Sequence, residues 1–277
     1  MQFSNLKIGK FDNISQCWRV VNSNENTVTT SLKLATYNVW FSEELIDERA
    51  TALLKILQEC NADIIALQEV TYHFLHVTLM QEWVRKSYFI SDFKDDTFSS
   101  YGVVMLSRIP IKTLSIHQLP SDMERKLLLA ELIINGKILK IATVHLESIK
   151  DSVDVRAEQL KVIFHLLDNA DSSVLMGDFN FCSSNKKETQ NIDSSYSDLW
   201  EQIRNDELGY TLNSEINTML SLNSSNKIMT RYDRVLFRQK QTDWRFKEIR
   251  LLGNEAISDE PKIFPSDHFG IMAEIEC

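Results

Sequence analysis

The sequence predicts an α/β protein in which two mixed β-sheets pack together and helices lie outside them. Short apolar runs of strand length recur from Ser31 onward, and helical patterns separate some of them. Asn135-Gly136 stands between two of these runs, and this dipeptide favours a tight hairpin between antiparallel strands. A purely parallel, doubly wound sheet is therefore disfavoured.

The strand-like runs are rich in β-branched and apolar residues and are bounded by polar ones. In chain order they lie at 32–40, 63–67, 102–106, 127–134, 138–144, 174–176, 232–237 and 270–275. Behind Ser42-Glu43-Glu44, which we expect to form an N-cap and an acidic first turn, three- and four-residue steps from Leu45 to Cys60 predict a helix. A second helix is expected over 154–167 and a surface loop over 183–198.

The length of 277 residues fits one large domain. Residues 1–30 are polar and weakly patterned, so we expect an N-terminal arm, able to pack on a single domain over residues 31–277. No apolar run approaches the ~20 residues of a membrane helix. Met1 to Lys10 lacks the order of a signal peptide, and the four cysteines are scattered. We expect an intracellular monomer, nuclear or cytoplasmic, that is not secreted and has no membrane partner.

The formal net charge of −9 argues against a protein that coats nucleic acid non-specifically, because such binding draws on Lys and Arg. One basic stretch, from Arg231 to Arg250, sets seven Lys and Arg against three acidic residues. It is interpreted either as a solvated pair of strands or as part of a groove for nucleic acid.

Several strand-like runs end abruptly in a polar residue. These residues are Asn38, Glu69, His145, and the pair Asp178 and Asn180. A strand that ends in such a group presents it on a rigid support at the sheet edge, where catalytic groups are held accurately. Each residue alone is equally consistent with a turn or cap, and Asp178-Phe179-Asn180 with an Asx turn.

Taken together, Asn38, Glu69 and Asp178 offer oxygen ligands suited to Mg²⁺ or Mn²⁺, and no Cys/His cluster suggests zinc. Near the C-terminus, Phe264 to His268 places a histidine at the start of a final strand, with Asp233 available from another strand. A carboxylate on the second ring nitrogen would favour the imidazolium, which suits a phosphorane-like transition state. A structural histidine is the alternative.

The ordered motifs resemble those of the endonuclease/exonuclease/phosphatase superfamily, over about residues 32–276. They are Thr36-Tyr37-Asn38, Leu67-Gln68-Glu69-Val70, His145-Leu146-Glu147-Ser148, Gly177-Asp178-Phe179-Asn180, Asp233-Arg234 and Ser266-Asp267-His268. Within the superfamily the chain is most similar to the tyrosyl-DNA phosphodiesterase 2 group, through Arg231-Tyr232-Asp233-Arg234, Leu251-Leu252-Gly253 and Phe264-Pro265-Ser266-Asp267-His268.

The resemblance implies a four-layered α-β-β-α sandwich, the DNase I-like fold, and a Mg²⁺-dependent phosphodiesterase. Its expected substrate is the 5′-phosphotyrosyl bond between a trapped topoisomerase and DNA, so the enzyme would act in DNA repair. The implied roles are as follows: Glu69 binds the metal with Asn38 beside it, Asp178 activates the attacking water, Asn180, His145 and His268 hold the phosphate, and Asp233 orients His268.

The resemblance also indicates residues that contact the substrate, with one departure from the group's pattern. The group has a Trp after the Thr of Gly209-Tyr210-Thr211, where it helps to wall the DNA strand, and this chain has Leu212. Tyr210 is a candidate substitute. Arg125 and Ser148 are expected either to contact the substrate or to serve as a strand-edge arginine and a cap, and Arg231 is a further candidate.

Other functions share the same motifs. Abasic DNA, RNA, a protein–RNA tyrosyl link or an inositol phosphate is an alternative substrate for the same core. A non-catalytic binding module is a third possibility, but it predicts the loss of a catalytic side chain, and none of the implied set is missing.

Overall fold

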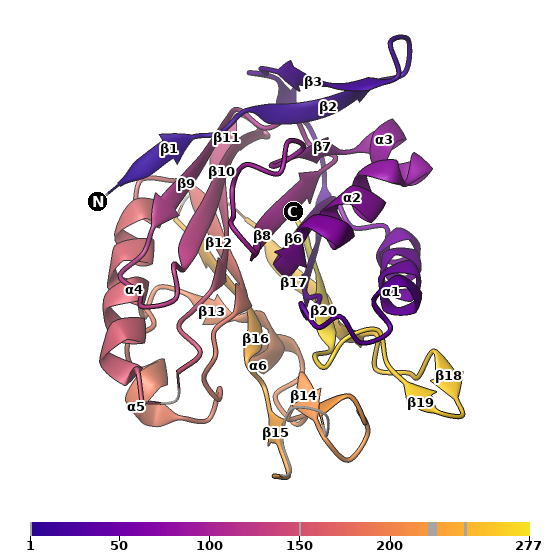
Figure 1. Ribbon diagram of the computed structural model, residues 1–277. Coiled ribbons are helices and arrows are strands. Elements are labelled where there is room, and N and C mark those ends of the chain that lie inside the picture. Colours follow the sequence, from indigo (N-terminus) through magenta and orange to yellow (C-terminus); the bar gives the residue numbers. More distant parts are fainter. Residues whose placement is uncertain (1, 150, 221–225, 241–242) are drawn as a thin grey trace.

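The computed structural model describes residues 2–149, 151–220, 226–240 and 243–277. Two large mixed sheets lie face to face, with α4 (Val153–Leu167) outside one and α1 (Ile46–Cys60) outside the other (Figure 1). These four layers are the predicted α-β-β-α sandwich. Over the same ranges, no helix combines the length and the apolar character needed to cross a membrane.

The first sheet contains eight strands among the described residues. They are β1 (Phe3–Asn5), β4 (Asn26–Thr27), β9 (Thr113–Gln118), β10 (Lys126–Ile134), β11 (Lys137–His145), β12 (Ser172–Asp178), β13 (Ser197–Asp198) and β16 (Asp233–Gln239). Their order is β1-β9-β10-β11-β12-β16-β13, with β4 beside β10. Strands β11 and β12 are parallel, whereas β12 and β16 are antiparallel, so the sheet is mixed.

The second sheet also has eight described strands, in the order β17-β20-β5-β6-β8-β7-β2-β3. They are β2 (Ile8–Asp12), β3 (Cys17–Val21), β5 (Ser31–Asn38), β6 (Ile64–Thr71), β7 (Phe89–Ile90), β8 (Tyr101–Ser107), β17 (Arg245–Leu252) and β20 (Gly270–Glu276). Two small two-stranded sheets lie outside the large ones: β14 (Leu212–Asn213) with β15 (Met229–Thr230), and β18 (Ser258–Asp259) with β19 (Lys262–Ile263).

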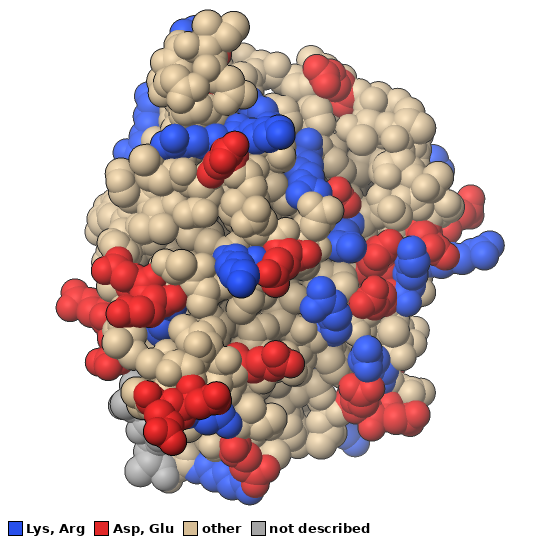
Figure 2. Space-filling model, turned by 90° about the vertical axis from the view of Figure 1, so that its right-hand side faces the viewer, with Lys and Arg blue, Asp and Glu red and all other residues tan. Residues whose placement is uncertain are grey.

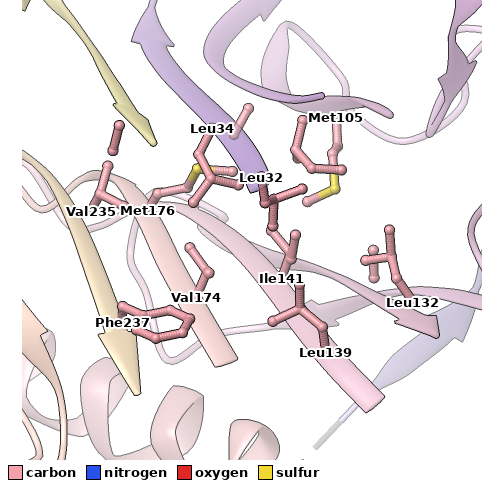
Figure 3. Packing of buried hydrophobic residues seen from close by; sticks show 14 of the residues in the cluster. Leu32, Leu34, Met105, Leu132, Leu139, Ile141, Val174, Met176, Val235 and Phe237 are labelled. Atoms are coloured by element: carbon pink, nitrogen blue, oxygen red, sulfur yellow. The ribbon is translucent and has the colours of Figure 1, made fainter. Parts of the chain in front are cut away.

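Apolar side chains from both sheets meet in the middle of the sandwich. Leu34 of β5 and Met105 of β8 face Ile141 of β11, Met176 of β12 and Phe237 of β16 (Figure 3). All of these side chains are buried. Because each buried aliphatic or aromatic side chain contributes about 1.5–3 kcal/mol, this interface is a major source of stability for both sheets.

The helices cover the outer faces of the sheets. Leu53 and Leu57 of α1 pack on the second sheet, and Leu160 and Ile163 of α4 pack on the first. The other described helices are α2 (Tyr72–Met80), α3 (Glu82–Ser87), α5 (Lys186–Thr189) and α6 (Leu199–Ile203). The core strands are therefore buried on both faces, which explains why they read as continuous apolar runs.

The structure reproduces the core strands and both long helices expected from the sequence, and the hairpin at Asn135-Gly136 joins antiparallel β10 and β11. Both turn residues have positive φ, 51° and 76°, as a tight hairpin requires. The expected N-cap of α1 is wrong. Leu45 precedes the helix with φ 48° and no side-chain cap, while the Ser42 hydroxyl accepts from the Glu44 amide.

Residues 3–27 add strands to both sheets. Strand β1 pairs with β9, and β4 pairs with β10, in the first sheet. Strand β2 pairs with β7 and β3 in the second, and Ile8 and Phe11 of β2 are buried. The sequence signal for these strands was weak because they are short and lie near the sheet edges.

Deleting residues 1–27 should strongly destabilise the protein. The deletion removes Ile8 and Phe11, each worth about 1.5–3 kcal/mol, and exposes the edge of β7. We expect a large fall in thermal midpoint or loss of soluble protein, measured by circular dichroism. Deleting only residues 1–5, where β1 is exposed throughout, is the control and should have a much smaller effect. An unchanged midpoint for the longer deletion would contradict this role.

Candidate active site

Strands from both sheets end at one place. Asn38 ends β5 and lies opposite Gln68, the neighbour of Glu69, in parallel β6. His145 and Asp178 are register partners at the ends of parallel β11 and β12, and Asp178 is in turn opposite Asp233 of β16. The Asn38 side chain reaches from the second sheet to the first, because its Nδ2 donates to Asp178 Oδ2 at 3.0 Å. The sequence-predicted polar strand ends therefore form one cluster.

Glycine is required at position 177, directly before Asp178. Its φ is +137°, and a Cβ at this position would lie 2.1 Å from the carbonyl oxygen of Val144. No side chain larger than hydrogen fits between β11 and β12 there. This close approach holds Asp178 next to His145.

The orientation of the Asn38 side-chain amide is set by a backbone N–H, which can only donate a hydrogen bond. The Trp40 amide donates to Asn38 Oδ1 at 3.0 Å, so the Nδ2 atom faces the carboxylates of Glu69 and Asp178, at 3.1 and 3.0 Å. The Asn38 oxygen thus accepts one backbone hydrogen bond, and its amide nitrogen holds the Glu69 and Asp178 carboxylates in place. The role of Asn38 as a metal ligand stays a prediction.

Asp178 is buried and uses its two oxygens differently. Oδ1 accepts from the Asn180 amide at 2.8 Å, which is the Asx turn considered from the sequence. Oδ2 faces the site, 3.6 Å from His145 Nε2 and 3.8 Å from His268 Nε2. Burial alone would raise the pKa of Asp178, but His268 and the hydrogen-bond donors lower it below its usual value. Asp178 is therefore ionised at neutral pH.

His268 and Asp233 form a buried pair. His268 Nδ1 donates to Asp233 Oδ2 at 2.8 Å. Burial alone would lower the pKa of His268, but Asp233 and Asp178 raise it well above 6.5. A raised pKa favours the imidazolium at neutral pH, and the Nε2 atom of His268 lies 3.8 Å from Asp178 Oδ2.

His145 has the opposite character. Burial lowers its pKa to about 3, and Arg125 and His268 act in the same direction. Arg125 Nη1 lies 2.9 Å from His145 Nδ1. Because a guanidinium only donates, Nδ1 must accept, and the neutral ring carries its proton on Nε2. Ser148 Oγ accepts from Arg125 Nη2 at 3.2 Å, so this serine lies beside the same guanidinium.

The carboxylates around Glu69 suit a divalent cation. Burial raises the pKa of Glu69 to about 7, and the nearby Asp267 carboxylate contributes. Glu69 and Asp267 are thus two buried like charges with oxygen donors, and such a pair is stabilised by a hard cation such as Mg²⁺. Ligand atoms of Asp178, Asp233 and His268 also lie within 4.8 Å of one another. The Asp233–His268 hydrogen bond already occupies that group, so we favour Glu69 and Asp267.

Asn180 lies at the rim of the cluster. Its Nδ2 donates to the Leu146 carbonyl at 2.9 Å, and its backbone is left-handed with φ 55°. Tyr210 and Leu212 flank Thr211, whose Oγ1 accepts from the Asp233 amide at 3.2 Å. Leu212 is buried and Tyr210 is half-buried. Both residues are thus tied to the strand that carries Asp233.

Arg231 is placed elsewhere. Its guanidinium is buried and pairs with Asp198 at 2.6 Å and Glu201 at 3.0 Å. The rest of the basic stretch is also largely paired, as when Arg238 and Lys240 both contact Asp168. The acidic partners argue against a groove for nucleic acid, and the exposed cations of β17 agree with a solvated strand, whereas Arg231 and Arg238 are buried. On the face shown in Figure 2, acidic and basic side chains are likewise intermixed.

Sequence reasoning missed several residues at the site. Asp267 was noted only as a neighbour of His268, although its position in the Ser-Asp-His motif was an available signal. Phe41 donates its amide to Glu69 Oε2 at 3.0 Å, and Tyr101 lies 6.3 Å from His145 between ring centroids. A cavity of about 370 Å³ adjoins His145 and is lined by Tyr101 and Arg125. No local motif marked the two aromatic residues.

The chain has detectable relatives in sequence. The profile of the Endonuclease/Exonuclease/phosphatase family matches residues 35–268. Tyrosyl-DNA phosphodiesterase 2 of Xenopus laevis is 27% identical over 272 residues, which cover 92% of this chain and 71% of the relative. The Homo sapiens protein of the same name is 26% identical over 238 residues, or 83% of this chain and 64% of that protein.

Solved structures share the fold. Danio rerio tyrosyl-DNA phosphodiesterase 2 complexed with a single-strand DNA product matches 90% of this chain and all of its own chain, with a TM-score of 0.77 and 23% identity. The truncated Caenorhabditis elegans protein gives a TM-score of 0.75 at 22% identity, over 89% of this chain and 98% of its own. The fold class predicted from the sequence is confirmed.

Replacing Arg125 with Met should change the tautomer of His145. Without a donor at Nδ1, the neutral ring is free to carry its proton on either nitrogen. In the wild type, ¹⁵N NMR of the imidazole should show the Nε2–H form, and in Arg125→Met a mixture. Arg19→Met, which alters an exposed arginine of β3, is the control. A wild-type spectrum with Nδ1–H would disprove the assignment.

Proposed function

Because the chain belongs to the endonuclease/exonuclease/phosphatase family, we propose that it is a Mg²⁺-dependent phosphodiesterase that hydrolyses the 5′-phosphotyrosyl bond between a trapped topoisomerase tyrosine and DNA. The observation that carries this proposal is the buried cluster of Glu69, Asp178 and His268, in which a carboxylate, an activating base and an imidazolium converge. Groups of these three kinds can activate a water molecule and stabilise the charge that develops during phosphodiester hydrolysis.

Asp178 is the proposed base. Its Oδ2 is held by Asn38 and faces the site, and its lowered pKa keeps it ionised. An ionised carboxylate held in this way can orient a water molecule and accept its proton as the water attacks phosphorus. General-base catalysis of this kind typically contributes ~10²–10⁴ in rate.

The two histidines supply different donors to the phosphate. His268 brings a positive charge, because Asp233 and Asp178 stabilise its imidazolium. His145 brings a neutral Nε2–H, because Arg125 occupies its Nδ1. Together with the Asn180 amide they would hold the non-bridging oxygens as negative charge grows on them in the transition state.

Glu69 and Asp267 would hold the metal. A bound Mg²⁺ supplies Lewis-acid stabilisation of charge on the phosphate and on the leaving phenolate, and Mn²⁺ is the alternative ion. Tyrosine has a reference pKa of about 10, so its phenolate departs more readily than a sugar alkoxide and needs less help from a general acid.

The choice of tyrosyl DNA as substrate rests on the relatives named tyrosyl-DNA phosphodiesterase 2 and on the single-strand DNA product bound to the Danio rerio structure. Leu212 has no indole on which a base can stack, and its side chain is buried. A phosphodiester with another nucleic-acid end, such as RNA, is the second candidate, because the core chemistry does not depend on an indole at this position.

Asp178→Asn should lower kcat on a 5′-tyrosyl oligonucleotide by ~10²–10⁴ with KM nearly unchanged, because the amide cannot accept the water proton. The assay compares Mg²⁺ with EDTA and tests tyrosyl DNA, tyrosyl RNA, abasic duplex and an inositol polyphosphate. Asp171→Asn, at the far end of β12, is the control. Activity on a different substrate alone would overturn the tyrosyl-DNA assignment.

The affinity for Mg²⁺ should depend on pH through Glu69. Because its pKa is raised to about 7, a proton occupies the carboxyl below that pH and competes with the cation. The dissociation constant, measured by calorimetry without substrate, should rise by up to about tenfold per pH unit below 7 and stay level above it. Glu69→Gln should weaken Mg²⁺ binding and remove the pH dependence. Glu59→Gln, which alters an exposed residue of α1, should change neither. A level profile in the wild type would contradict the ligand role of Glu69.

A further inference from the structure

The loop after β5 contains a strained residue held by a buried arginine. Trp40 has a left-handed backbone with φ 61°, which bulky residues rarely adopt. The Arg49 guanidinium lies 4.4 Å from the Trp40 ring and donates to the carbonyls of Val39, Trp40 and Ser42, at 3.4, 3.3 and 2.6 Å. A conformation imposed by so many contacts is more typical of a functional site than of a simple connection.

The strained loop fixes the position of Phe41. The amide of Phe41 is bound to Glu69, and its ring stacks on Tyr101 with centroids 4.7 Å apart and planes at 7°. Even so, 47% of Phe41 is exposed. One ring face is thus covered by Tyr101, while about half of the residue remains open to solvent, and its amide is bound to Glu69.

Tyr101 connects this ring to the phosphate-binding groups. The Arg125 guanidinium lies 5.7 Å from the Tyr101 ring, and the His145 ring lies 6.3 Å from it. The Tyr101 ring therefore stacks on the partly exposed Phe41 ring and also lies close to Arg125 and His145. A planar group bound near the phosphate can extend this stack.

We propose that Phe41, backed by Tyr101, is a substrate subsite that stacks on an aromatic ring adjoining the scissile phosphate. The inference rests on the proposed function, whose substrate has two such rings, the terminal nucleobase and the tyrosine phenol. Both offer the same flat π-face. Stacking on Phe41 would supply part of the binding energy that an indole at position 212 would give and that Leu212 cannot.

The test compares Phe41→Ala and Phe41→Leu with the wild type. Leucine keeps an apolar side chain but removes the ring. Phe3→Ala is the matched control. Phe3, in β1, is likewise exposed, at 58%, and its ring stacks on a single ring, that of His117. The probes are a 5′-tyrosyl oligonucleotide, the same with an abasic terminal nucleotide, and the same with a methyl ester in place of tyrosine. Affinity is measured by fluorescence anisotropy in EDTA and KM with Mg²⁺.

Both Phe41 variants should weaken binding of the full probe by about 5- to 100-fold, as expected for the loss of one stacked ring. Phe3→Ala should not. If Phe41 stacks on the terminal nucleobase, the abasic probe should bind the wild type and the Phe41 variants with equal affinity. If Phe41 stacks on the tyrosine phenol, the methyl ester probe should bind them with equal affinity instead. Phe41→Trp should retain affinity.

Two results would overturn the subsite. One is binding of the full probe by Phe41→Ala within about twofold of the wild type. The other is an equal loss of affinity on all three probes, which would indicate general damage to the site. If the wild type fails to cleave 5′-tyrosyl DNA, the proposed function fails, while anisotropy in EDTA still decides whether Phe41 stacks on a substrate ring.

Discussion

The site depends on keeping Asp178 charged although its side chain is buried. A buried carboxylate without partners takes up a proton, and its charge is then lost. Here the Asn38 amide, the Asn180 backbone and the His268 imidazolium hold the negative charge. Asn38 comes from one sheet and Asp178 from the other, so the two sheets must pack in correct register for the base to exist. The apolar core between them is therefore also a condition for the chemistry.

The same arrangement explains how two histidines near one carboxylate reach different protonation states. Asp233 accepts a hydrogen bond from Nδ1 of His268 and favours the imidazolium form of that ring. Arg125 donates to Nδ1 of His145 and disfavours the imidazolium form there. Burial together with Arg125 keeps His145 neutral, whereas Asp233 and Asp178 outweigh burial at His268. The Nε2 atom of each ring lies within 3.8 Å of Asp178 Oδ2. The site thereby gains one positive and one neutral donor instead of two cations that would repel each other.

The sequence predicted the parts that depend on local pattern. Core strands were visible because both of their faces are buried, and Asn135-Gly136 fixed a hairpin through its turn chemistry. The cluster of Asn38, Glu69, Asp178 and His268 followed from polar residues at strand ends. Pattern failed where a partner distant in sequence decides the outcome. Arg231 was a candidate for substrate contact, but the structure places Asp198 and Glu201 against it. The electrostatic influence of Asp267 on Glu69 likewise became apparent only in the folded protein.

Three residues near the site have strained backbones that specific contacts hold in place. Trp40, Glu69 and Asn180 all have left-handed backbones, with φ of 61°, 58° and 55°, and each such residue costs about 1–3 kcal/mol. Glu69 lies at an irregularity in the pairing of β6 with β8, which turns its side chain toward the cluster rather than along the regular alternation of the strand. Asn180 is held by the Asx turn of Asp178, and Trp40 by Arg49. Because different contacts hold each strained residue, the site is formed before substrate arrives, and little binding energy is needed to assemble it.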